Sequence, residues 1–274
     1  MDNTKSISVI GCGWLGFPLA KSLLNKGYTV KGSTTSNDKL PVLLEEGIEP
    51  FLVQFPDNCS VGTILNLLKS DILIIAVPPG RNSHKNQSYF GLLNTLTEAL
   101  PDSSIKKIIF ISSTSVYGDS NGIVNESTTP IPDNDAGKRM LTAEQIILNT
   151  DVEHVIVRLA GLIGPGRHPG KFLAGKTGVL NGLAPVNLIH LDDVIGILNA
   201  IITDENSSGI YNATAPHHPT RQEFYTSAAQ SLGLDPPQFI LEKASWKKVN
   251  SIRVTEELNY KFAVPNLMKW LTVH

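Results

Sequence analysis

The sequence predicts an α/β protein built on a doubly wound parallel sheet. Three observations predict this fold. A strand-like apolar segment near Lys5 runs directly into a glycine-rich turn and then into a helix with periodic apolar residues. Strand-like and helix-like segments then alternate along the first part of the chain, and several of the strands are uninterrupted apolar runs. A parallel strand that helices cover on both faces requires such a run.

The turn after the first strand has the sequence GCGWLG. Gly11 permits the tight turn, Gly13 removes the Cβ that would block a pyrophosphate, and Gly16 lets the helix lie close to the strand. We expect the backbone amides of Gly13, Trp14 and Leu15 to point at an anion, with the helix dipole behind them. The alternative is an ordinary structural turn, but the strand before it and the helix after it favour nucleotide binding.

The following segments continue the alternation. The first helix ends at Lys26-Gly27, where a glycine follows a cationic last turn. Further strands are expected at 28–33, 49–55, 71–77 and 106–111, and further helices at 38–46, 61–69 and 87–100. These elements complete the first half of a doubly wound sheet of the Rossmann type.

The pattern loosens in the second half of the chain. We expect a loop at 118–134, a helix at 137–149, a core strand at 154–159, short strands at 186–190 and 209–212, and helices at 192–203 and 222–232. Glycine and proline punctuate residues 161–182, which favours a binding surface or a lid. The expected domains are a dinucleotide-binding domain at 1–160, with return strands near 186–190 and 209–212, and a smaller, loop-rich substrate lobe at 161–185 and 213–274.

Composition favours a soluble protein with a small-molecule partner. The 274 residues are 41% hydrophobic and 18% charged, and the formal net charge of -2 gives no basic excess to suggest nucleic acid. Cys12 and Cys59 are too few for a disulfide framework and lack metal-ligand spacing. The first apolar run resembles a signal peptide, but its glycines fit a strand–helix unit better. We expect a cytoplasmic monomer or homodimer that binds no membrane and no metal.

Hydroxyl side chains gather at the end of the strand at 106–111. Ser112 and Ser113 lie in the segment SSTSVYGD, at the edge where an open α/β sheet binds its ligands. The alternative is a serine- and threonine-rich turn that caps the strand. Further on, the chain carries RLAGLIGPGRHPG from residue 158, IHLDDV from residue 189 and YNATAP from residue 211. With these motifs the chain resembles the extended short-chain dehydrogenase/reductase superfamily of NAD(P)-dependent sugar epimerases and dehydratases, and within it the atypical YeeZ-like branch.

The resemblance implies an incomplete catalytic site. In that superfamily a Tyr-x-x-x-Lys pair supplies the acid/base and holds the nicotinamide ribose. Matching the motif to this chain puts Ala136 at the tyrosine and Met140 at the lysine, so both catalytic side chains are expected to be absent. Lys138 faces another side of the helix and is expected to be a solvated lysine. Ser113 is the one catalytic candidate, as the residue that hydrogen-bonds the reacting oxygen.

The resemblance also suggests substrate contacts besides Ser113. Tyr117 is a second candidate, although its counterpart in the superfamily mainly packs and orients the loop. Arg167 and His168 follow a Gly-Pro-Gly turn where related enzymes shape the substrate pocket, and with nearby lysines they would give a cationic mouth. The alternative for both residues is loop charge in water.

Two further polar groups have structural alternatives. His190 is followed by two aspartates, which suggests either an acid/base pair or a helix junction that an aspartate caps. Arg158, at the end of a buried strand, is expected to be paired and structural.

The expected cofactor is NADP, in preference to NAD. NAD-binding members carry an acid about 20 residues after the first glycine, but the corresponding strand end here is Ser33-Thr-Thr-Ser36. Its hydroxyls can donate to a 2′-phosphate, with Lys31 or Lys39 in reach. The turn at 78–81 is expected to line the groove between adenosine and nicotinamide. The expected cofactor contacts are Gly11, Gly13, Trp14, Leu15, Gly16, Ser33, Thr34, Thr35, Ser36, Val77, Pro78, Pro79 and Ser112.

Two functions from different classes remain open. One is an oxidoreductase or epimerase acting on a small carbonyl or hydroxyl compound or on a sugar nucleotide. The other is a non-catalytic NADP(H)-binding sensor or regulatory protein, which the missing pair favours. A pocket lined by Ser113 and at least one titratable group would favour the enzyme.

Overall fold

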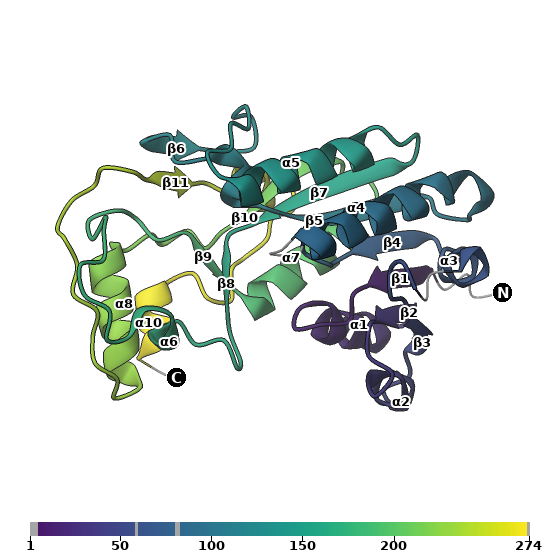
Figure 1. Ribbon diagram of the computed structural model, residues 1–274, viewed down its shortest axis with the longest axis horizontal. Coiled ribbons are helices and arrows are strands. Elements are labelled where there is room, and N and C mark those ends of the chain that lie inside the picture. The colour runs from purple at the N-terminus through teal and green to yellow at the C-terminus, as the bar shows by residue number, and fades with distance from the viewer. Residues whose placement is uncertain (1–4, 58–59, 80–82, 273–274) are drawn as a thin grey trace. The chain divides into compact units, whose positions relative to one another are not determined.

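A computed structural model describes residues 5–57, 60–79 and 83–272. The chain divides into two compact units (Figure 1). The first consists of Met1–Ser112, Arg139–Val157 and Asn206–Ile210, and the second of Ser113–Lys138, Arg158–Glu205 and Tyr211–His274. None of the helices in the described residues is long and apolar enough to cross a membrane.

The first unit is organised on a seven-stranded sheet with the order β10-β7-β5-β4-β1-β2-β3. Strand β1 pairs in parallel with both β2 and β4, and β2–β3 and β4–β5 are parallel as well. The chain therefore builds outward from β1 in one direction and from β4 in the other, which is the doubly wound arrangement. The strands are β1 Ser6–Ile10, β2 Thr29–Thr34, β3 Glu49–Leu52, β4 Ile72–Ile75, β5 Lys107–Ser113, β7 Glu153–Leu159 and β10 Gly209–Ala213.

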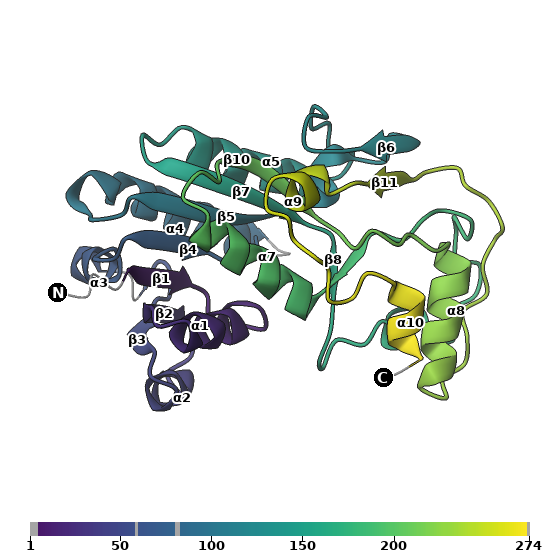
Figure 2. The same ribbon diagram turned by 180° about the vertical axis from the view of Figure 1, so that it is seen from behind.

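Helices cover this sheet between its strands. They are α1 Gly16–Asn25, α2 Lys39–Glu45, α3 Val61–Leu67, α4 Ser83–Glu98, η1 Leu100–Asp102 and α5 Asp135–Leu148. Helices α4 and α5 lie side by side on one face, in front of the sheet in Figure 1 and behind it in Figure 2. All four residues of β4 are buried, as an uninterrupted apolar strand requires. The predicted fold class is thus confirmed.

The second unit contains short strands and six helical segments among its described residues. Strand β6 Gly122–Val124 pairs with β11 Lys247–Val249, and β8 Gly161–Ile163 pairs with β9 Leu188–His190. The helices are η2 Thr114–Tyr117, α6 Gly170–Leu173, α7 Leu191–Thr203, α8 Arg221–Ser231, α9 Ile252–Glu256 and α10 Leu267–Leu271. Helices α6, α8 and α10 lie together in both views (Figures 1 and 2).

The return strand predicted near 186–190 does not join the large sheet. It forms β9, which pairs with β8 in a separate two-stranded sheet, whereas the strand predicted at 209–212 forms β10 at the edge of the large sheet. The Gly161 amide donates to the Asn187 carbonyl at 3.1 Å, and this bond begins the β8–β9 pairing. Three-residue strands carry too few side chains for their pattern to identify a partner.

A buried carboxylate ties the C-terminal tail to α7. Asp193 is fully buried, and its Oδ1 accepts hydrogen bonds from the Tyr260 hydroxyl at 3.0 Å and the Ala263 amide at 2.6 Å. Its Oδ2 accepts from the Val264 amide at 3.1 Å. The tail then enters α10, whose Leu267 and Trp270 pack in a core with α8. The C-terminal tail is therefore a folded part of the second unit.

Candidate functional site

The glycine turn of the first unit has the close contacts that its sequence predicts. Gly11 has φ +94°, a value that favours glycine. A Cβ on Gly16 would lie 2.1 Å from the Gly11 carbonyl oxygen, so α1 approaches the turn too closely for any side chain there. A Cβ on Gly11 would lie 2.5 Å from Val77 Cγ1, which places Val77 beside the turn. The predicted geometric roles of Gly11 and Gly16 are confirmed.

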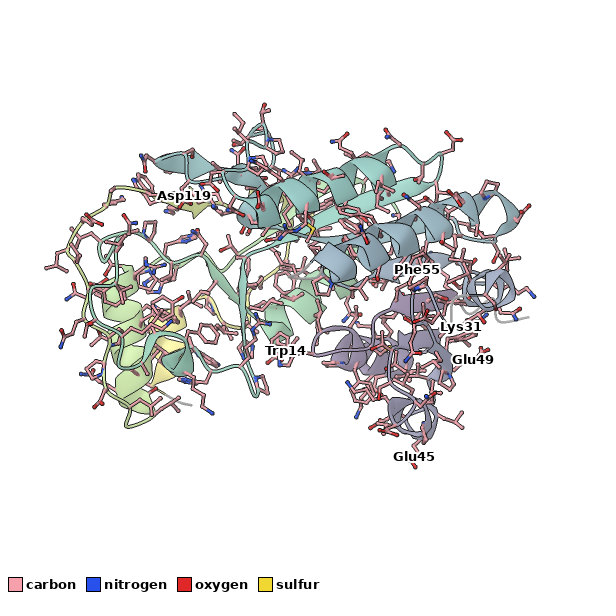
Figure 3. All side chains as sticks on the ribbon, viewed as in Figure 1. Trp14, Lys31, Glu45, Glu49, Phe55 and Asp119 are labelled. Atoms are coloured by element: carbon pink, nitrogen blue, oxygen red, sulfur yellow. The ribbon has the colours of Figure 1, made fainter. Side chains whose placement is uncertain are left out.

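Gly13 is the exposed glycine of this turn. A Cβ on it would meet no described atom within 4 Å, so the space above Gly13 can admit an anion. Its amide donates to the Gly11 carbonyl at 2.8 Å, which corrects the expectation that this amide points at the ligand. Leu15 is buried at the N-cap of α1, and Trp14 is half-buried at the same end of the helix (Figure 3).

The end of β2 uses two of its four hydroxyls within the protein. Ser33 is only 3% exposed, and its Oγ accepts a hydrogen bond from the Gly11 amide at 2.9 Å. Thr34 is buried, and its Oγ1 accepts from the Ser36 amide at 3.2 Å. Ser33 therefore braces the glycine turn, while Thr35 is exposed and Ser36 half-buried.

The two candidate cations near this strand have different environments. The Lys31 ammonium donates to the Asn66 carbonyl at 2.6 Å, next to Glu49 on the neighbouring strand (Figure 3). Lys39 is the first residue of α2 and is exposed. Burial raises the pKa of the Cys12 thiol to about 12, and the charge of Lys39 acts in the opposite direction. The positive charge of Lys39 therefore acts on Cys12 in the glycine turn.

The other predicted cofactor contacts lie at the ends of β4 and β5. Val77 and Pro79 are half-buried, and Pro78 is exposed. Residues 80 and 81, the rest of the turn predicted to line the groove, lie outside the described residues. Cys59 also lies outside them. Ser112 is buried and its hydroxyl donates to the wholly buried Glu144 on α5. The Ser112 side chain thus joins β5 to α5.

These features fit a dinucleotide. The fit rests on the open space over Gly13, which leaves room for a pyrophosphate at the start of α1, while the close approach at Gly16 holds α1 against the turn. Residues 11–16, Thr35, Ser36, Lys39 and Val77 are the ones that would hold it. A bound nicotinamide dinucleotide supplies hydride donation or acceptance.

The second unit contains a pocket of about 660 Å³. Ser113 lies in its wall at the end of β5, and the Ser113 Oγ accepts a hydrogen bond from the Ser115 amide at 3.2 Å. A hydroxyl has one donor in addition to its acceptor sites, so Ser113 keeps a proton with which to contact a ligand. The pocket is lined by Ser113, Thr114, Ser115, Asp119, Gly161, Leu180, Asn181, Ala184, Pro185, Val186, Asn187, Leu188, Arg221, Tyr225, Ser245, Trp246 and Lys247.

The titratable residues of this pocket come from distant parts of the chain. The Lys247 ammonium lies 2.9 Å from Asp119 Oδ1, and the Ser245 hydroxyl donates to Asp119 Oδ2 at 2.9 Å. Burial raises the pKa of the Tyr225 phenol above its ordinary value, which is already well above neutral pH. Arg221 is the remaining charged residue of the lining. Asp119 ends the SSTSVYGD motif but was not recognised as a site residue, and Arg221, Tyr225, Ser245 and Lys247 belong to no motif, so only folding brings this set together.

Tyr117 lies in the interior and not on the wall of this pocket. It is 3% exposed, its hydroxyl donates to Asn212 Oδ1 at 2.8 Å, and it accepts a hydrogen bond from Arg158 at 2.9 Å. Arg158 is itself buried and lies over the Tyr117 ring, with 4.9 Å between the guanidinium carbon and the ring centroid. Tyr117 therefore packs in the interior, as its counterpart in the superfamily does, and does not line the pocket. The expectation that Arg158 is paired is confirmed.

Arg167 and His168 also lie away from the pocket lining. Arg167 is exposed, and its amide donates to the Gly164 carbonyl at 2.9 Å across a tight reversal of the chain. The His168 ring stacks on Trp270 with centroids 5.5 Å apart, and its Nδ1 accepts from the Gly170 amide at 3.1 Å. The reversal turns this segment toward α10, which is why the pair does not form the predicted mouth of this pocket.

His190 caps α7 through its own ring. Its Nδ1 accepts a hydrogen bond from the Asp192 amide at 3.2 Å, so the histidine is the cap and not an aspartate as expected. Asp193 points instead at the C-terminal tail, as described above. His190 Nδ1 also lies 3.5 Å from Asp192 Oδ2, but neither His190 nor the two aspartates line the pocket. Within the described residues, no three histidine, cysteine or acidic side chains converge as a metal site would require.

Ala136 and Met140 lie one turn apart on α5. Ala136 is exposed, Met140 is 6% exposed and packs in the interior, and Lys138 is exposed. Because a methyl group and a thioether transfer no protons, neither position offers an acid or a base.

The chain is similar to known proteins over nearly its whole length. The family model described as the NAD dependent epimerase/dehydratase family matches residues 7–214. Protein YeeZ of Escherichia coli strain K12 is 38% identical over 267 residues, which cover 96% of this chain and 97% of YeeZ. This relationship agrees with the resemblance inferred from the motifs.

Two solved structures share the fold. A functionally unknown conserved protein from Silicibacter pomeroyi is 23% identical with a TM-score of 0.80, covering 98% of each chain. UDP-glucuronic acid 4-epimerase from Bacillus cereus, solved in complex with NAD, is 19% identical with a TM-score of 0.79, covering 97% of this chain and 94% of the epimerase. The glycine turn and the doubly wound sheet agree with the family model and with the relationship to YeeZ. The chain belongs to the NAD-dependent epimerase/dehydratase family.

Proposed function

We propose that this protein binds NADP(H) and acts as an oxidoreductase on a small compound that carries a hydroxyl or carbonyl group. The pocket of the second unit carries the proposal, because Ser113 lies in its wall together with the titratable Asp119, Tyr225 and Lys247. A ligand pocket that combines a hydroxyl donor with titratable groups is what proton-coupled chemistry requires. In this proposal Ser113 donates a hydrogen bond to the reacting oxygen.

A second candidate is a non-catalytic NADP(H) sensor. Ala136 and Met140 favour it, because the motif match assigns them the positions of the acid/base pair. Loss of a positioned acid/base costs about 10²- to 10⁴-fold in rate. We therefore expect NADPH oxidation with simple aldehydes or common sugar nucleotides to be at or below detection. Without a lysine at residue 140, the nicotinamide half should bind loosely, so 2′,5′-ADP should bind nearly as tightly as NADP.

The preference for NADP is proposed to depend on Lys39. The end of β2 offers no carboxylate to bind a ribose hydroxyl, and Lys31 is engaged by Asn66. Lys39 is exposed and its charge reaches the glycine turn. Calorimetry should show tighter binding of NADP than of NAD. Lys39→Glu should weaken NADP by about 10-fold or more and leave NAD nearly unchanged, whereas Lys26→Glu at the far end of α1 should alter neither. Equal binding of NADP and NAD by the native protein would contradict the preference.

Native mass spectrometry separates the two candidate functions. Freshly purified protein is sprayed under native conditions, and any retained small molecule is identified before and after incubation with NADP and with NADPH. An oxidoreductase changes the mass of that molecule by two hydrogens, and Ser113→Ala slows the change by about 10-fold or more. A sensor retains the nucleotide and leaves any other ligand unchanged. Brisk aldehyde reduction that Ser113→Ala does not affect would refute both the match at Ala136 and the role of Ser113.

A further inference from the structure

The backbone of Arg221 is anchored at the wall of the pocket of the second unit. It is the first residue of α8, and its amide donates to the Ala184 carbonyl at 2.8 Å. The residue before it, Thr220, forms a reciprocal capping box with Glu223, so the start of the helix is fixed on both sides. Arg221 is one of the residues that line the pocket. The backbone from which its side chain extends is therefore fixed before a ligand arrives.

The guanidinium of Arg221 has unused hydrogen-bond donors. Its Nε is buried without a hydrogen-bond partner among the described residues. None of the ion pairs within 4.0 Å among those residues includes Arg221. The guanidinium carbon lies 5.8 Å from the Tyr225 ring centroid and 6.0 Å from that of Phe239. These distances are at the outer limit of about 6 Å for a cation–π contact. An aromatic face at that range attracts the charge but accepts no hydrogen bond from the guanidinium edge.

The other charges of the pocket compensate each other. Asp119 and Lys247 form an ion pair at 2.9 Å, and Ser245 adds a hydrogen bond to the same carboxylate. Arg221 therefore contributes one uncompensated positive charge. A ligand with one negative charge balances it, whereas a diphosphate would bring a second negative charge into a pocket that also contains Asp119.

We propose that Arg221 makes this pocket a site for a monocarboxylate, bound through the guanidinium, whose carbon skeleton carries the hydroxyl or carbonyl group that Ser113 contacts. The inference rests on the proposed function and adds the chemical class of the substrate. The planar fork of arginine matches the two oxygens of a carboxylate, which is a stronger and more directional contact than a lysine gives. Tyr225 and Trp246 supply aromatic surface for the rest of the ligand.

A matched pair of probes tests the carboxylate. Binding of p-nitrophenyl β-D-glucuronide and p-nitrophenyl β-D-glucoside is measured by calorimetry on the full chain saturated with NADP, because the two differ only in a carboxylate against a hydroxymethyl group. We expect the glucuronide to bind about 10- to 100-fold more tightly, the range of a charge-assisted hydrogen bond. Arg221→Gln should reduce its affinity to that of the glucoside, and Arg221→Lys should give an intermediate value. Lys261→Gln, an exposed lysine of the same unit outside the lining, is the control.

Other outcomes would overturn the inference. Equal binding of the two probes, absence of binding by both, or glucuronide binding that Arg221→Gln leaves unchanged would each refute the carboxylate site. UDP binding that exceeds glucuronide binding and depends on Arg221 would show that the guanidinium serves a diphosphate instead. NADP titration of Arg221→Gln separates this failure from that of the proposed function. Retained NADP affinity leaves the proposed function standing, whereas a native protein that binds no NADP refutes the proposed function itself.

Discussion

Gly13 and Gly16 lie three residues apart and have opposite surroundings. A side chain on Gly16 would overlap a backbone oxygen, whereas a side chain on Gly13 would extend into open space. Gly16 is therefore needed for the fold, and Gly13 is needed for a ligand that approaches the turn from solvent. Substitution at the two positions should separate stability from binding.

Gly13→Glu should abolish NADP binding and leave the fold intact. The new side chain would occupy the space of the pyrophosphate and place a negative charge against it, which we expect to weaken binding by more than about 100-fold. Calorimetric titration measures the affinity, and the melting temperature reports the fold. Asn25→Glu adds the same charge at the exposed far end of α1 and should leave affinity unchanged. Undiminished NADP affinity in Gly13→Glu would refute the phosphate-binding turn.

Several side chains that the sequence suggests as ligand contacts instead form hydrogen bonds within the protein. Ser33 accepts the Gly11 amide, Ser112 donates to Glu144, and Tyr117 bridges Arg158 and Asn212. Each hydroxyl is hydrogen-bonded to another group of the protein, which constrains the fold. A polar side chain near a ligand site therefore serves the site only if the interior does not need it.

The contact of α1 with β1 depends on a single missing Cβ. Gly16→Ala should reduce the free energy of unfolding by about 1–3 kcal/mol, because backbone atoms of the turn must move to accommodate the methyl group. Gly62→Ala on α3 is the matched control, since the nearest described atom to the new methyl group would be the Ser60 hydroxyl oxygen at 4.0 Å. That change should stabilise the protein by about 0.4–1 kcal/mol through the unfolded state. Urea denaturation of both variants measures the difference, and equal effects would contradict the close approach.

Helix α7 and the C-terminal tail are joined through Asp193. Asp193→Ala would leave the Tyr260 hydroxyl and the Ala263 and Val264 amides without their acceptor, which should cost about 3 kcal/mol of unfolding free energy. Asp192→Ala, one residue earlier with a largely exposed carboxylate, should cost less than about 1 kcal/mol. Thermal denaturation of the two variants tests this contrast. Similar losses would show that the tail is held by packing alone.

Asp71 joins the starts of three strands of the large sheet. Its Oδ2 accepts from the Ser6 amide and hydroxyl, each at 2.9 Å, and its Oδ1 accepts from the Lys106 ammonium at 2.8 Å. The hydrogen bond from Lys106, followed by that from the Ser6 amide, lowers the pKa of Asp71 to about 2. The charged carboxylate therefore stabilises the folded chain above the unfolded pKa of about 3.9, and this contribution disappears as the pH falls through the folded pKa.

Acid denaturation measures the contribution of Asp71. Asp71→Asn should lower the free energy of unfolding at pH 7 by about 1 kcal/mol, after allowance for solvent screening of the exposed lysine. The same variant should show a smaller loss of stability than the native protein between about pH 4 and about pH 2. Asp151→Asn, at an exposed acid, should follow the native curve. A native-like pH dependence in Asp71→Asn would refute the assignment.

The doubly wound fold class and the glycine turn could be predicted from the sequence because both depend on local pattern. Uninterrupted apolar runs such as Ile72–Ile75 can be satisfied only as covered parallel strands, and the spacing of Gly11, Gly13 and Gly16 carries its own steric logic. The partners of the short strands could not be predicted in the same way. Strand β9 has three residues, and its partner β8 is a separate segment of the chain that only folding brings beside it.

The sequence by itself determined the family, the doubly wound sheet and the location of the glycine turn, since each follows from residues that are neighbours in the chain. Only the tertiary structure decided which polar side chains line the second unit's pocket. It excluded Tyr117, Arg167 and His168 from that lining and brought Asp119, Arg221 and Lys247 to it. The physical reason is that a pocket is formed by long-range packing, and the hydrogen-bond requirements of the interior determine which polar groups remain available to a ligand.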